Sequence, residues 1–429
     1  MSSLSQSLPK PFPQSLKSAR TVNPIRAIVD QVTSGPEAPR TDGKKRIPLS
    51  LGDPSIYGNL DPPSLLVEGV RAAAALGKSN GYVNAVGTDA ARSAVASYYS
   101  TALSPLSMSD VVLGSGCSGA MELAITTLLD PGTTMLVPNP GFPLYEVIAT
   151  SHGAGVKKYD LDPSKGWECD LAHMESLIDG TVRCILINNP SNPCGSVFSE
   201  SHLEAIVRLA QKHDLPILSD EVYAGMVFSG ASFLPLADVA SRLGRQVPVI
   251  TASGLAKQFL VPGWRVGWLT FHDDVGHRLA DVRRGVNALA QVIIGSSHIV
   301  QAGVVAVLDP KSDEGKEEVR AFRERTNKTL EGLSSFTCDE LAKCHGLTVV
   351  RSSAALYVMV GLEIEQFDGS FHDDVTFTKL LLAEENVFAL PGQCFGAKNF
   401  FRVVYCAPKE ILGESFERIK DFCERHKKK

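Results

Sequence analysis

Apolar and polar positions alternate with two different periods through the middle of the chain. Six short apolar runs, several of them β-branched, predict strands at 111–115, 134–138, 182–188, 215–220, 247–253 and 266–271. Between them, segments such as 117–130 and 200–213 repeat apolar residues at steps of three and four, which predicts helices with one buried face. Strands that alternate with helices form a mostly parallel sheet with helices on both faces, so we predict an α/β fold.

The pattern changes near residue 311. Residues 311–333 are rich in charge and predict a long exposed helix, and strand-like runs follow at 347–353, 356–362 and 401–407. This pattern of a helix followed by separate strands indicates a second, α+β domain. The predicted regions are a flexible N-terminal tail (1–45), a segment that completes the smaller domain (46–79), a large α/β domain (80–310) and a C-terminal small domain (311–429).

Composition limits the function classes. The chain of 429 residues has a formal net charge of −5, which gives no electrostatic reason for nucleic acid or an anionic membrane as partner. No stretch approaches the ~20 apolar residues that a membrane helix needs. Nine cysteines without a CxxC pair favour a reducing compartment. We therefore expect a cytoplasmic protein, with no metal site.

The first 29 residues leave a second localisation open. They carry six serines and four basic residues and no acidic residue, which partly resembles a mitochondrial transit segment. Pro9, Pro11 and Pro13 break any amphipathic helix at that point. A plain tail is therefore the preferred interpretation, and a mitochondrial location is the alternative.

A glycine-rich turn, GSGCSG at 114–119, follows the first predicted strand and opens a helix. Backbone N–H groups and hydroxyls at a helix N-terminus suit a phosphate. A dinucleotide site needs an acidic residue at the end of the next strand, about 20 residues on. That strand instead ends in Pro138, Asn139 and Pro140. The turn therefore predicts a site for one phosphate monoester, and a simple tight turn is the alternative.

Charged residues gather at predicted strand ends, where ligands of such sheets bind. Lys257 follows the strand at 247–253 among small apolar residues, where an unpaired charge is costly and an amine could form a Schiff base. Arg265 could bind a phosphate with two parallel hydrogen bonds. Asp220 ends an apolar strand and needs a cation, such as a protonated pyridine nitrogen. Taken singly, each residue has a simpler interpretation: Lys257 as a surface lysine, Arg265 as a structural arginine and Asp220 as a helix N-cap.

Four more residues fit a ring-shaped cofactor and its substrate. Tyr223 and Asn192 could hydrogen-bond a phenolic oxygen of the ring, and Phe142 could stack on its face. Arg402 lies in the second domain between apolar strand residues, and its guanidinium could bind the carboxylate of a substrate. A carboxylate held by one domain and a cofactor held by the other give a reason for closure on substrate.

The ordered motifs GSGCSGA, NPGFPLY, NNPSNPCG, SDEVY, SGLAKQFLVPGWRVGW and FRVVY resemble those of the fold-type I aminotransferases that depend on pyridoxal 5'-phosphate, most of all the tyrosine aminotransferases. The resemblance covers residues 47–425. It implies a large domain with a mostly parallel seven-stranded sheet sandwiched by helices, and a smaller α+β domain. It also implies ping-pong transfer of the amino group of an aromatic amino acid, tyrosine above all, to a 2-oxo acid in amino acid catabolism.

The resemblance assigns roles by position in the motifs. Lys257 would carry the cofactor as a covalent aldimine and move the proton at the substrate Cα, with Asp220 and Tyr223 as the other catalytic residues. The implied cofactor-binding residues are Tyr82, Gly116, Cys117, Ser118, Phe142, Asn192, Asp220, Tyr223, Ser253, Lys257 and Arg265. Tyr82 would reach the phosphate of the partner subunit, so that a homodimer shares its active sites. The implied substrate-binding residues are Arg402, Gly52 and Asn192.

Three departures from the family pattern leave the substrate range open. Gly119 stands where relatives often carry a longer polar residue, Gln258 and Phe259 replace a basic and aromatic pair, and Ser253 lies four residues before Lys257. An alanine or broad-specificity aminotransferase and a β-eliminating lyase therefore remain alternatives. A nicotinamide-dependent dehydrogenase and a regulator without catalytic activity on the same fold are alternatives from other classes.

Overall fold

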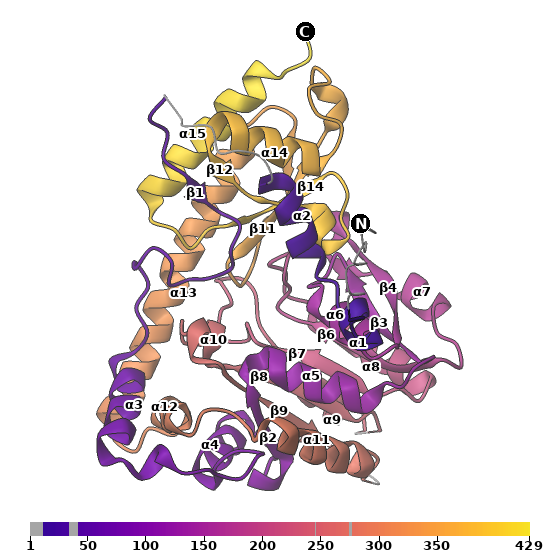
Figure 1. Ribbon diagram of the computed structural model, residues 1–429, viewed down its shortest axis with the longest axis vertical. Helices are drawn as coiled ribbons and strands as arrows, with labels where there is room; N and C mark the ends of the chain where they lie inside the picture. Colours follow the sequence, from indigo (N-terminus) through magenta and orange to yellow (C-terminus); the bar gives the residue numbers. More distant parts are fainter. Residues whose placement is uncertain (1–11, 34–41, 245, 274–276) are drawn as a thin grey trace, which may run out of the picture.

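A computed structural model describes residues 12–33, 42–244, 246–273 and 277–429 (Figure 1). An eight-stranded sheet forms the lower half of the molecule as drawn. Its strands, in spatial order, are β2 (Val111–Ser115), β9 (Val266–His272), β8 (Val249–Gly254), β7 (Ile217–Asp220), β6 (Val182–Asn188), β3 (Thr134–Asn139), β4 (Gly155–Asp162) and β5 (Glu168–Cys169). Only β9 and β5 run antiparallel to their neighbours, so the other six strands end at the same edge of the sheet.

Helices cover both faces of this sheet, because alternate strand residues point to opposite sides. Leu136, Ile185 and Ile187 pack with α7 (Leu171–Ser176), α8 (Glu200–Lys212) and α9 (Leu236–Arg242). Met135 and Leu186 pack on the other side with α5 (Gly116–Leu128), α6 (Leu144–Ser151) and α11 (Ala280–Ile293). The predicted α/β architecture with its mostly parallel, helix-covered sheet is confirmed.

The sheet differs from the sequence prediction at one edge. The six strand runs read from the sequence are all present, but β4 was not among them. Half of its eight residues are only partly buried and two are exposed, so the sequence GVKKYDLD has no continuous apolar run. β4 brings the count to the seven strands that the resemblance implied, and β5 adds a two-residue eighth strand at the open edge.

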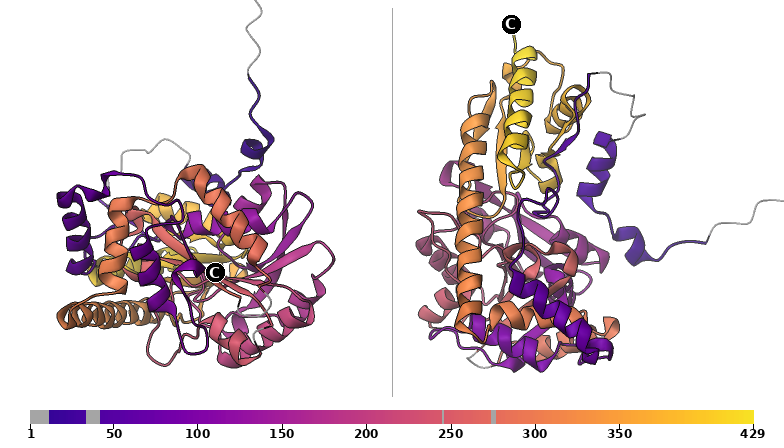
Figure 2. Two further views of the ribbon diagram at one scale, coloured as in Figure 1. Left: turned by 90° about the horizontal axis from the view of Figure 1, so that it is seen from below. Right: turned by 90° about the vertical axis from the view of Figure 1, so that its left-hand side faces the viewer.

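A smaller four-stranded antiparallel sheet lies in the upper half of Figure 1. Its order is β10 (Leu347–Val349), β11 (Tyr357–Leu362), β14 (Phe400–Val404) and β13 (Leu390–Pro391). Helices α14 (Asp374–Glu385) and α15 (Lys409–Arg425) pack beside it, and the 29-residue helix α13 (Asp313–Leu341) runs along most of the molecule (Figure 2). Short strand β1 (Ile47–Pro48) joins this region by pairing with β12 (Val387–Phe388).

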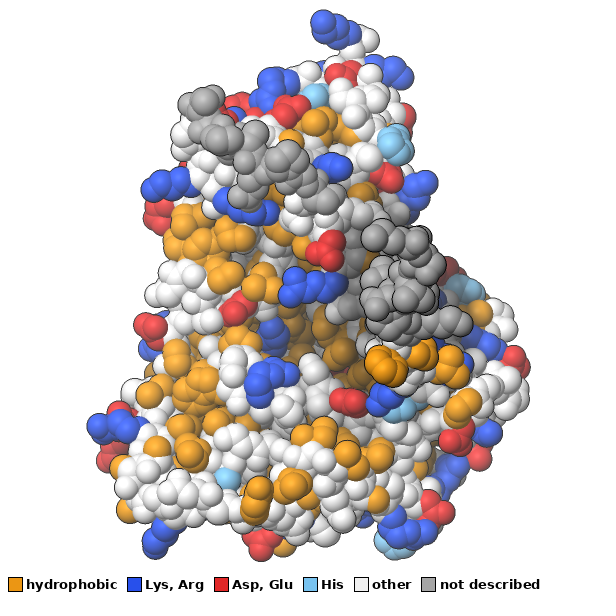
Figure 3. Space-filling model, in the orientation of Figure 1, with side chains coloured by type: hydrophobic (Ala, Val, Ile, Leu, Met, Phe, Trp, Pro, Cys, Tyr) orange, Lys and Arg blue, Asp and Glu red, His pale blue; other side chains and the backbone are white. Residues whose placement is uncertain are grey.

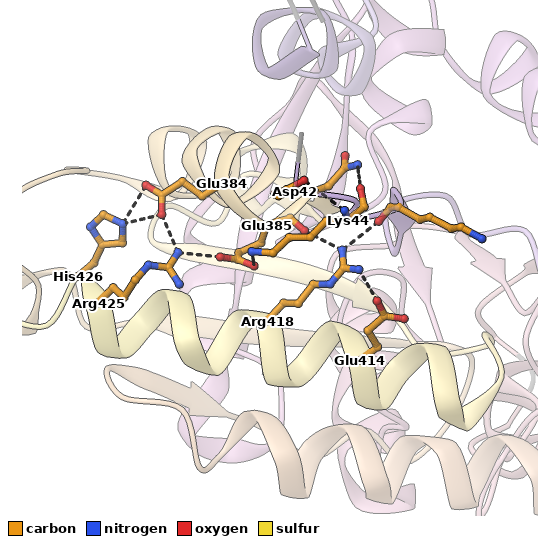
Figure 4. Close-up of polar contacts among 10 residues, drawn as sticks. Asp42, Lys44, Glu384, Glu385, Glu414, Arg418, Arg425 and His426 are labelled. Carbon is orange, nitrogen blue, oxygen red and sulfur yellow. Dashed lines mark hydrogen bonds and ion pairs between the residues drawn. The ribbon is translucent and has the colours of Figure 1, made fainter. Parts of the chain in front are cut away.

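An ion-pair cluster fixes the chain next to β1 to this upper region (Figure 4). The carboxylate of Glu385, at the end of α14, is almost fully buried and accepts from Lys44 Nζ at 2.6 Å and from Arg425 Nη2 at 2.7 Å. Arg418 of α15 donates to the carbonyl oxygens of Lys45 and Glu385. The cluster therefore joins three separate parts of the chain.

The segment predicted as a flexible tail contains two helices, α1 (Leu16–Arg20) and α2 (Pro24–Thr33). Buried Val32 of α2, with Ile25, Ile28 and Val29 beside it, packs on Phe388 and Phe395 of the upper region. This apolar stripe, and not the composition of residues 1–45, decides the local structure.

The domain boundaries placed after residues 79 and 310 remain a prediction from the sequence.

Helices α3 (Ser64–Leu76) and α12 (His298–Leu308) pack closely at the other end of the molecule. Gly69 and Gly303 allow the close approach, since a Cβ at Gly69 would lie 2.8 Å from that of Ala306. None of the helices in the described part of the chain combines the length and the apolar character of a membrane span.

Candidate active site

A cavity of about 270 Å³ opens where the parallel strands end, between the large sheet and the smaller sheet. The space-filling view shows the surface hollowed between these two halves, with hydrophobic side chains around the depression (Figure 3). Ten of the thirteen residues predicted for the site line this cavity. They are Gly52, Cys117, Ser118, Phe142, Asn192, Asp220, Tyr223, Lys257, Arg265 and Arg402.

Asp220 is the last residue of β7 and is 5% exposed. Its Oδ2 accepts from the hydroxyl of Tyr145 at 2.7 Å, and Oδ1 accepts from the backbone N–H of Val222 at 3.2 Å and faces Cys117 Sγ at 3.7 Å. Burial raises the pKa of Asp220, and these hydrogen bonds oppose the rise. Among the described residues no cation bonds this carboxylate, so it can pair with a cation that a ligand brings.

Lys257 lies on the short helix α10 (Leu255–Gln258), directly after β8. Its Nζ donates to the carbonyl oxygen of Gly52 at 2.5 Å, and none of the described carboxylates forms an ion pair with it. Gly52 belongs to the N-terminal segment, 205 residues away in sequence. The amine is therefore held at the cavity by a neutral acceptor and not by a carboxylate.

The N-terminus of α5 and Arg265 form an anion-binding corner of the cavity. Gly116 begins α5 with a φ of +70°, which strains most other residues, and a Cβ there would lie 2.5 Å from Arg265 Nη2 and displace the guanidinium. Arg265 donates to the carbonyl oxygens of Pro262 and Ser115, at 3.0 and 3.3 Å. The first-turn N–H groups of a helix have no partner within it and point outward. With the hydroxyl of Ser118, this corner suits a phosphate.

Arg402, on β14, is 4% exposed and lies in contact with two aromatic rings. Its Cζ is 4.4 Å from the ring centre of Tyr357 and 4.6 Å from that of Phe395. Nη1 donates to Asn192 Oδ1 at 2.8 Å and Nη2 to the carbonyl oxygen of Ser50 at 2.7 Å, while Nε is buried without a partner. Burial lowers the pKa of Arg402. A carboxylate ligand would supply the missing negative charge.

Two aromatic pairs complete the walls of the cavity. The hydroxyl of Tyr223 lies 2.7 Å from that of Tyr357, and burial raises the pKa of Tyr223 well above its usual range. Phe142 stands edge-on to Tyr145, with ring centres 5.8 Å apart. Tyr145 therefore contacts both Phe142 and Asp220.

Three predicted residues do not line the cavity. Gly116 lies behind the guanidinium of Arg265. Ser253 is buried, and its Oγ accepts from Gln258 Nε2 at 2.8 Å and lies 3.3 Å from the hydroxyl of Tyr99. Tyr82 is 91% exposed. Within this chain, therefore, Ser253 and Tyr82 are not placed to touch a ligand in the cavity.

The sequence interpretation missed several lining residues. Tyr145 could have been found, since it follows Phe142 by three residues in the same NPGFPLY motif and lies at the start of the observed helix α6, one residue after Leu144. Tyr357 gave no signal, because it sits in an apolar run that reads as an ordinary strand. Ile25 also lines the cavity, from the segment predicted as a tail.

Comparison with known proteins agrees with this geometry. The family model described as aminotransferase class I and II matches residues 44–419. The chain is 43% identical to a tyrosine aminotransferase of Bos taurus, over 95% of this chain and 88% of that protein, and 42% identical to one of Dictyostelium discoideum, over 97% of both. The crystal structure of a tyrosine aminotransferase from Leishmania infantum superposes with a TM-score of 0.88 at 33% identity, over 98% of this chain and all of that one.

The family model covers most of the chain and includes every residue that lines the cavity except Ile25. The structure agrees with this family match in the order of its strands, in the lysine after β8 and in the aspartate at the end of β7. The chain belongs to the class I and II aminotransferase family.

Proposed function

We propose that this chain transfers the amino group of tyrosine to a 2-oxo acid, with pyridoxal phosphate as its cofactor. The observation that carries the proposal is the meeting of Lys257, Asp220, Arg265 and Arg402 at one cavity, although they lie far apart in the sequence. The aminotransferase activity follows from the family. Tyrosine as donor is supported by relatives named tyrosine aminotransferase at 42–43% identity.

The residues around the cavity fit this cofactor. The buried carboxylate of Asp220 has no cation of its own and suits a pyridinium nitrogen. The start of α5 and Arg265 suit the phosphate, and Lys257 suits the aldehyde. Tyr223 and Asn192 would bind the phenolic oxygen. When bound, pyridoxal phosphate supplies an electron-withdrawing ring that stabilises negative charge at the substrate Cα.

Among the described residues that line the cavity, Lys257 is the only lysine. Its Nζ would take the proton from the substrate Cα and return it, as general base and then general acid. The Gly52 carbonyl oxygen accepts a hydrogen bond from Nζ and holds the amine at the cavity. Because Gly52 and Lys257 come from separate segments, this contact also fixes the N-terminal segment against the large sheet.

Substrate recognition divides between a polar end and an apolar wall. Arg402 would bind the α-carboxylate through its free edge, with Asn192 and Ser50 fixing the guanidinium. Ile25, Leu51 and Leu390 also line the cavity. An apolar wall favours an uncharged side chain over a second carboxylate, since an unpaired buried charge is costly.

We propose a homodimer in which Tyr82 completes the partner's phosphate site. Val292, Ile293 and Ile294 are exposed apolar residues at the end of α11. Ile293 also lines a second cavity of about 350 Å³, which reaches Ser118 at the start of α5. An exposed apolar patch of this kind favours association. The exposed Tyr82 lies in the neighbouring loop, since the carbonyl of Gly81 bonds His298.

We also propose the cytoplasm as compartment. All nine cysteines lie in the described ranges and all are free thiols, eight of them buried. Free buried thiols are typical of proteins in a reducing environment.

Rates of amino transfer to a panel of 2-oxo acids test the donor directly. We expect kcat/KM to be highest with tyrosine, with phenylalanine close behind, and about 100-fold lower with aspartate, whose second carboxylate would face Ile25 and Leu390. A higher kcat/KM with alanine or aspartate than with tyrosine would contradict tyrosine as the preferred amino donor. No transfer from any donor contradicts the reaction.

A further inference from the structure

We infer that Tyr357 is a positioning residue for amino transfer, whose ring supports the guanidinium of Arg402 and whose hydroxyl orients the hydroxyl of Tyr223. The inference rests on the proposed function of the cavity. It adds a residue that belongs to neither the phosphate corner nor the amine, and that joins the carboxylate-binding side of the site to the ring-binding side.

The ring of Tyr357 has a clear partner. Tyr357 is the first residue of β11, is 2% exposed and lines the cavity. Its ring centre lies 4.4 Å from Arg402 Cζ, within the range of a cation–π contact. The two hydrogen bonds of Arg402 hold its terminal nitrogens, but its Nε is buried and unpartnered. The ring therefore supplies attraction and steric support that these hydrogen bonds do not.

The hydroxyl of Tyr357 has a single partner in the described chain. It lies 2.7 Å from the hydroxyl of Tyr223, and the two rings meet edge-on at 5.7 Å. A hydroxyl carries one proton. If Tyr223 donates its proton to a phenolic oxygen in the cavity, the proton between the tyrosines must come from Tyr357. Tyr357 then donates to Tyr223, which makes Tyr223 a stronger donor.

Packing fixes this hydroxyl in place. A Cβ at Gly52 would lie only 2.2 Å from the Tyr357 hydroxyl oxygen, so the backbone of the N-terminal segment lies directly against it. The carbonyl of the same Gly52 accepts from Lys257. Tyr357 is thus in contact with three groups of the site: Arg402, Tyr223 and the backbone that holds the amine.

Another tyrosine shows what a purely structural role looks like. Tyr405 is fully buried just after β14, in the same small sheet, and its hydroxyl donates to the carbonyl oxygen of Ala354 at 3.0 Å. It does not line the cavity. Tyr405→Phe therefore removes a buried hydroxyl from this sheet without touching the site, and serves as the matched control.

The experiment compares Tyr357→Phe, Tyr357→Leu and Tyr405→Phe in the full chain. Tyr357→Phe keeps the ring, so we expect KM for tyrosine within about 3-fold of the unmodified protein and kcat about 10-fold lower. Tyr357→Leu also removes the ring, and we expect KM to rise about 10-fold. For Tyr405→Phe we expect both constants within about 2-fold.

Two readouts do not depend on turnover. Fluorescence titration of the cofactor-free chain with pyridoxal phosphate should give a Kd about 5-fold weaker for Tyr357→Phe, and the pH midpoint of the visible band of the loaded protein should move upward. A weaker donor at Tyr223 leaves more electron density on the cofactor, which raises the midpoint. The same losses should vanish in a Tyr223→Phe background, because the Tyr357 hydroxyl then has no partner to orient.

The result that overturns the inference is a Tyr357→Phe variant that matches Tyr405→Phe in Kd and pH midpoint, or losses that simply add to those of Tyr223→Phe. In either case an unmodified protein that binds the cofactor and transfers amino groups leaves the proposed function intact. Failure of the unmodified protein to bind pyridoxal phosphate overturns the proposed function itself.

Discussion

At the scale of single residues, the site is built from charges that the chain leaves uncompensated. Asp220 and Arg402 are both about 95% buried, and among the described residues neither forms an ion pair. Burying a charge without a counter-ion costs several kcal/mol. Their placement makes physical sense when a cofactor brings a cation to Asp220 and a substrate brings an anion to Arg402.

Asp220→Asn should therefore act on the cofactor and not on the fold. We expect the Kd for pyridoxal phosphate to weaken about 10-fold or more and the rate of amino transfer to fall about 100-fold, because the amide cannot hold the ring nitrogen protonated. Titration of the cofactor-free chain and steady-state kinetics measure the two effects. Glu221→Gln is the control, since Glu221 is equally buried but lies outside the cavity lining. Equal effects of the two substitutions would contradict this role.

Glu221 makes a separate, pH-dependent prediction. Burial raises its pKa to about 7, and its carboxyl bonds Ser219 Oγ and the N–H of Leu236. Between about pH 4.5 and 7 the folded chain keeps a proton that the unfolded chain has released, so stability falls as the pH rises. In Glu221→Gln the free energy of unfolding should fall by about 2 kcal/mol less between pH 5 and pH 8. Urea unfolding at fixed protein concentration measures the free energy of unfolding at each pH. Parallel pH profiles for the unmodified protein and Glu221→Gln would refute this role of Glu221.

At the scale of elements, burial decides where the sequence could be read. The central strands are apolar on both faces, and β8 is buried at all six positions. Each of these strands therefore gives a continuous apolar run, which the sequence analysis could identify. Strand β4, which lies next to the short edge strand β5, and helix α2 each bury only one stripe, among prolines or charges, and were missed. Residues at strand ends, such as Asp220 and Lys257, could be predicted because a parallel sheet fixes where its ligand lies.

The Glu385 cluster predicts how the N-terminal segment is fastened. Glu385→Gln leaves Lys44 and Arg425 without their shared buried partner, and we expect a loss of about 1–2 kcal/mol of unfolding free energy. Glu414→Gln removes an exposed carboxylate that pairs with Arg418 four residues along the same helix, and should cost about 0.5 kcal/mol or less. Denaturant unfolding of both variants makes the comparison. A larger loss in Glu414→Gln than in Glu385→Gln would be inconsistent with the buried cluster as the anchor.

At the scale of the whole molecule, the cavity exists only when three parts of the chain meet. The large sheet contributes Asp220 and Lys257, the small sheet Tyr357 and Arg402, and the N-terminal segment Gly52. Such convergence explains why Tyr357 could not be predicted, because its partners lie 134 residues before and 45 residues after it in the sequence. Ser253, which the resemblance assigned to the phosphate, instead bonds Gln258 and lies outside the cavity lining.

The proposed sharing of active sites in a dimer predicts complementation between two damaged chains. Lys257→Ala removes the amine of its own site, whereas Tyr82→Ala should weaken cofactor binding about 10-fold in the partner's site. Mixed dimers, isolated with two affinity tags, then contain one intact site, and we expect about half the activity of the unmodified dimer at limiting cofactor. Mixed dimers without an intact site, or a monomer in sedimentation, would argue against sharing.

The most direct measurement is the visible absorption of the purified protein after pyridoxal phosphate has been added and the excess removed by gel filtration. If Lys257 carries the cofactor, the unmodified protein shows a band that disappears when tyrosine is added and returns with a 2-oxo acid, and Lys257→Ala shows no such band. An unmodified protein without a band, or a Lys257→Ala protein whose band responds to tyrosine in the same way, would contradict this role of Lys257.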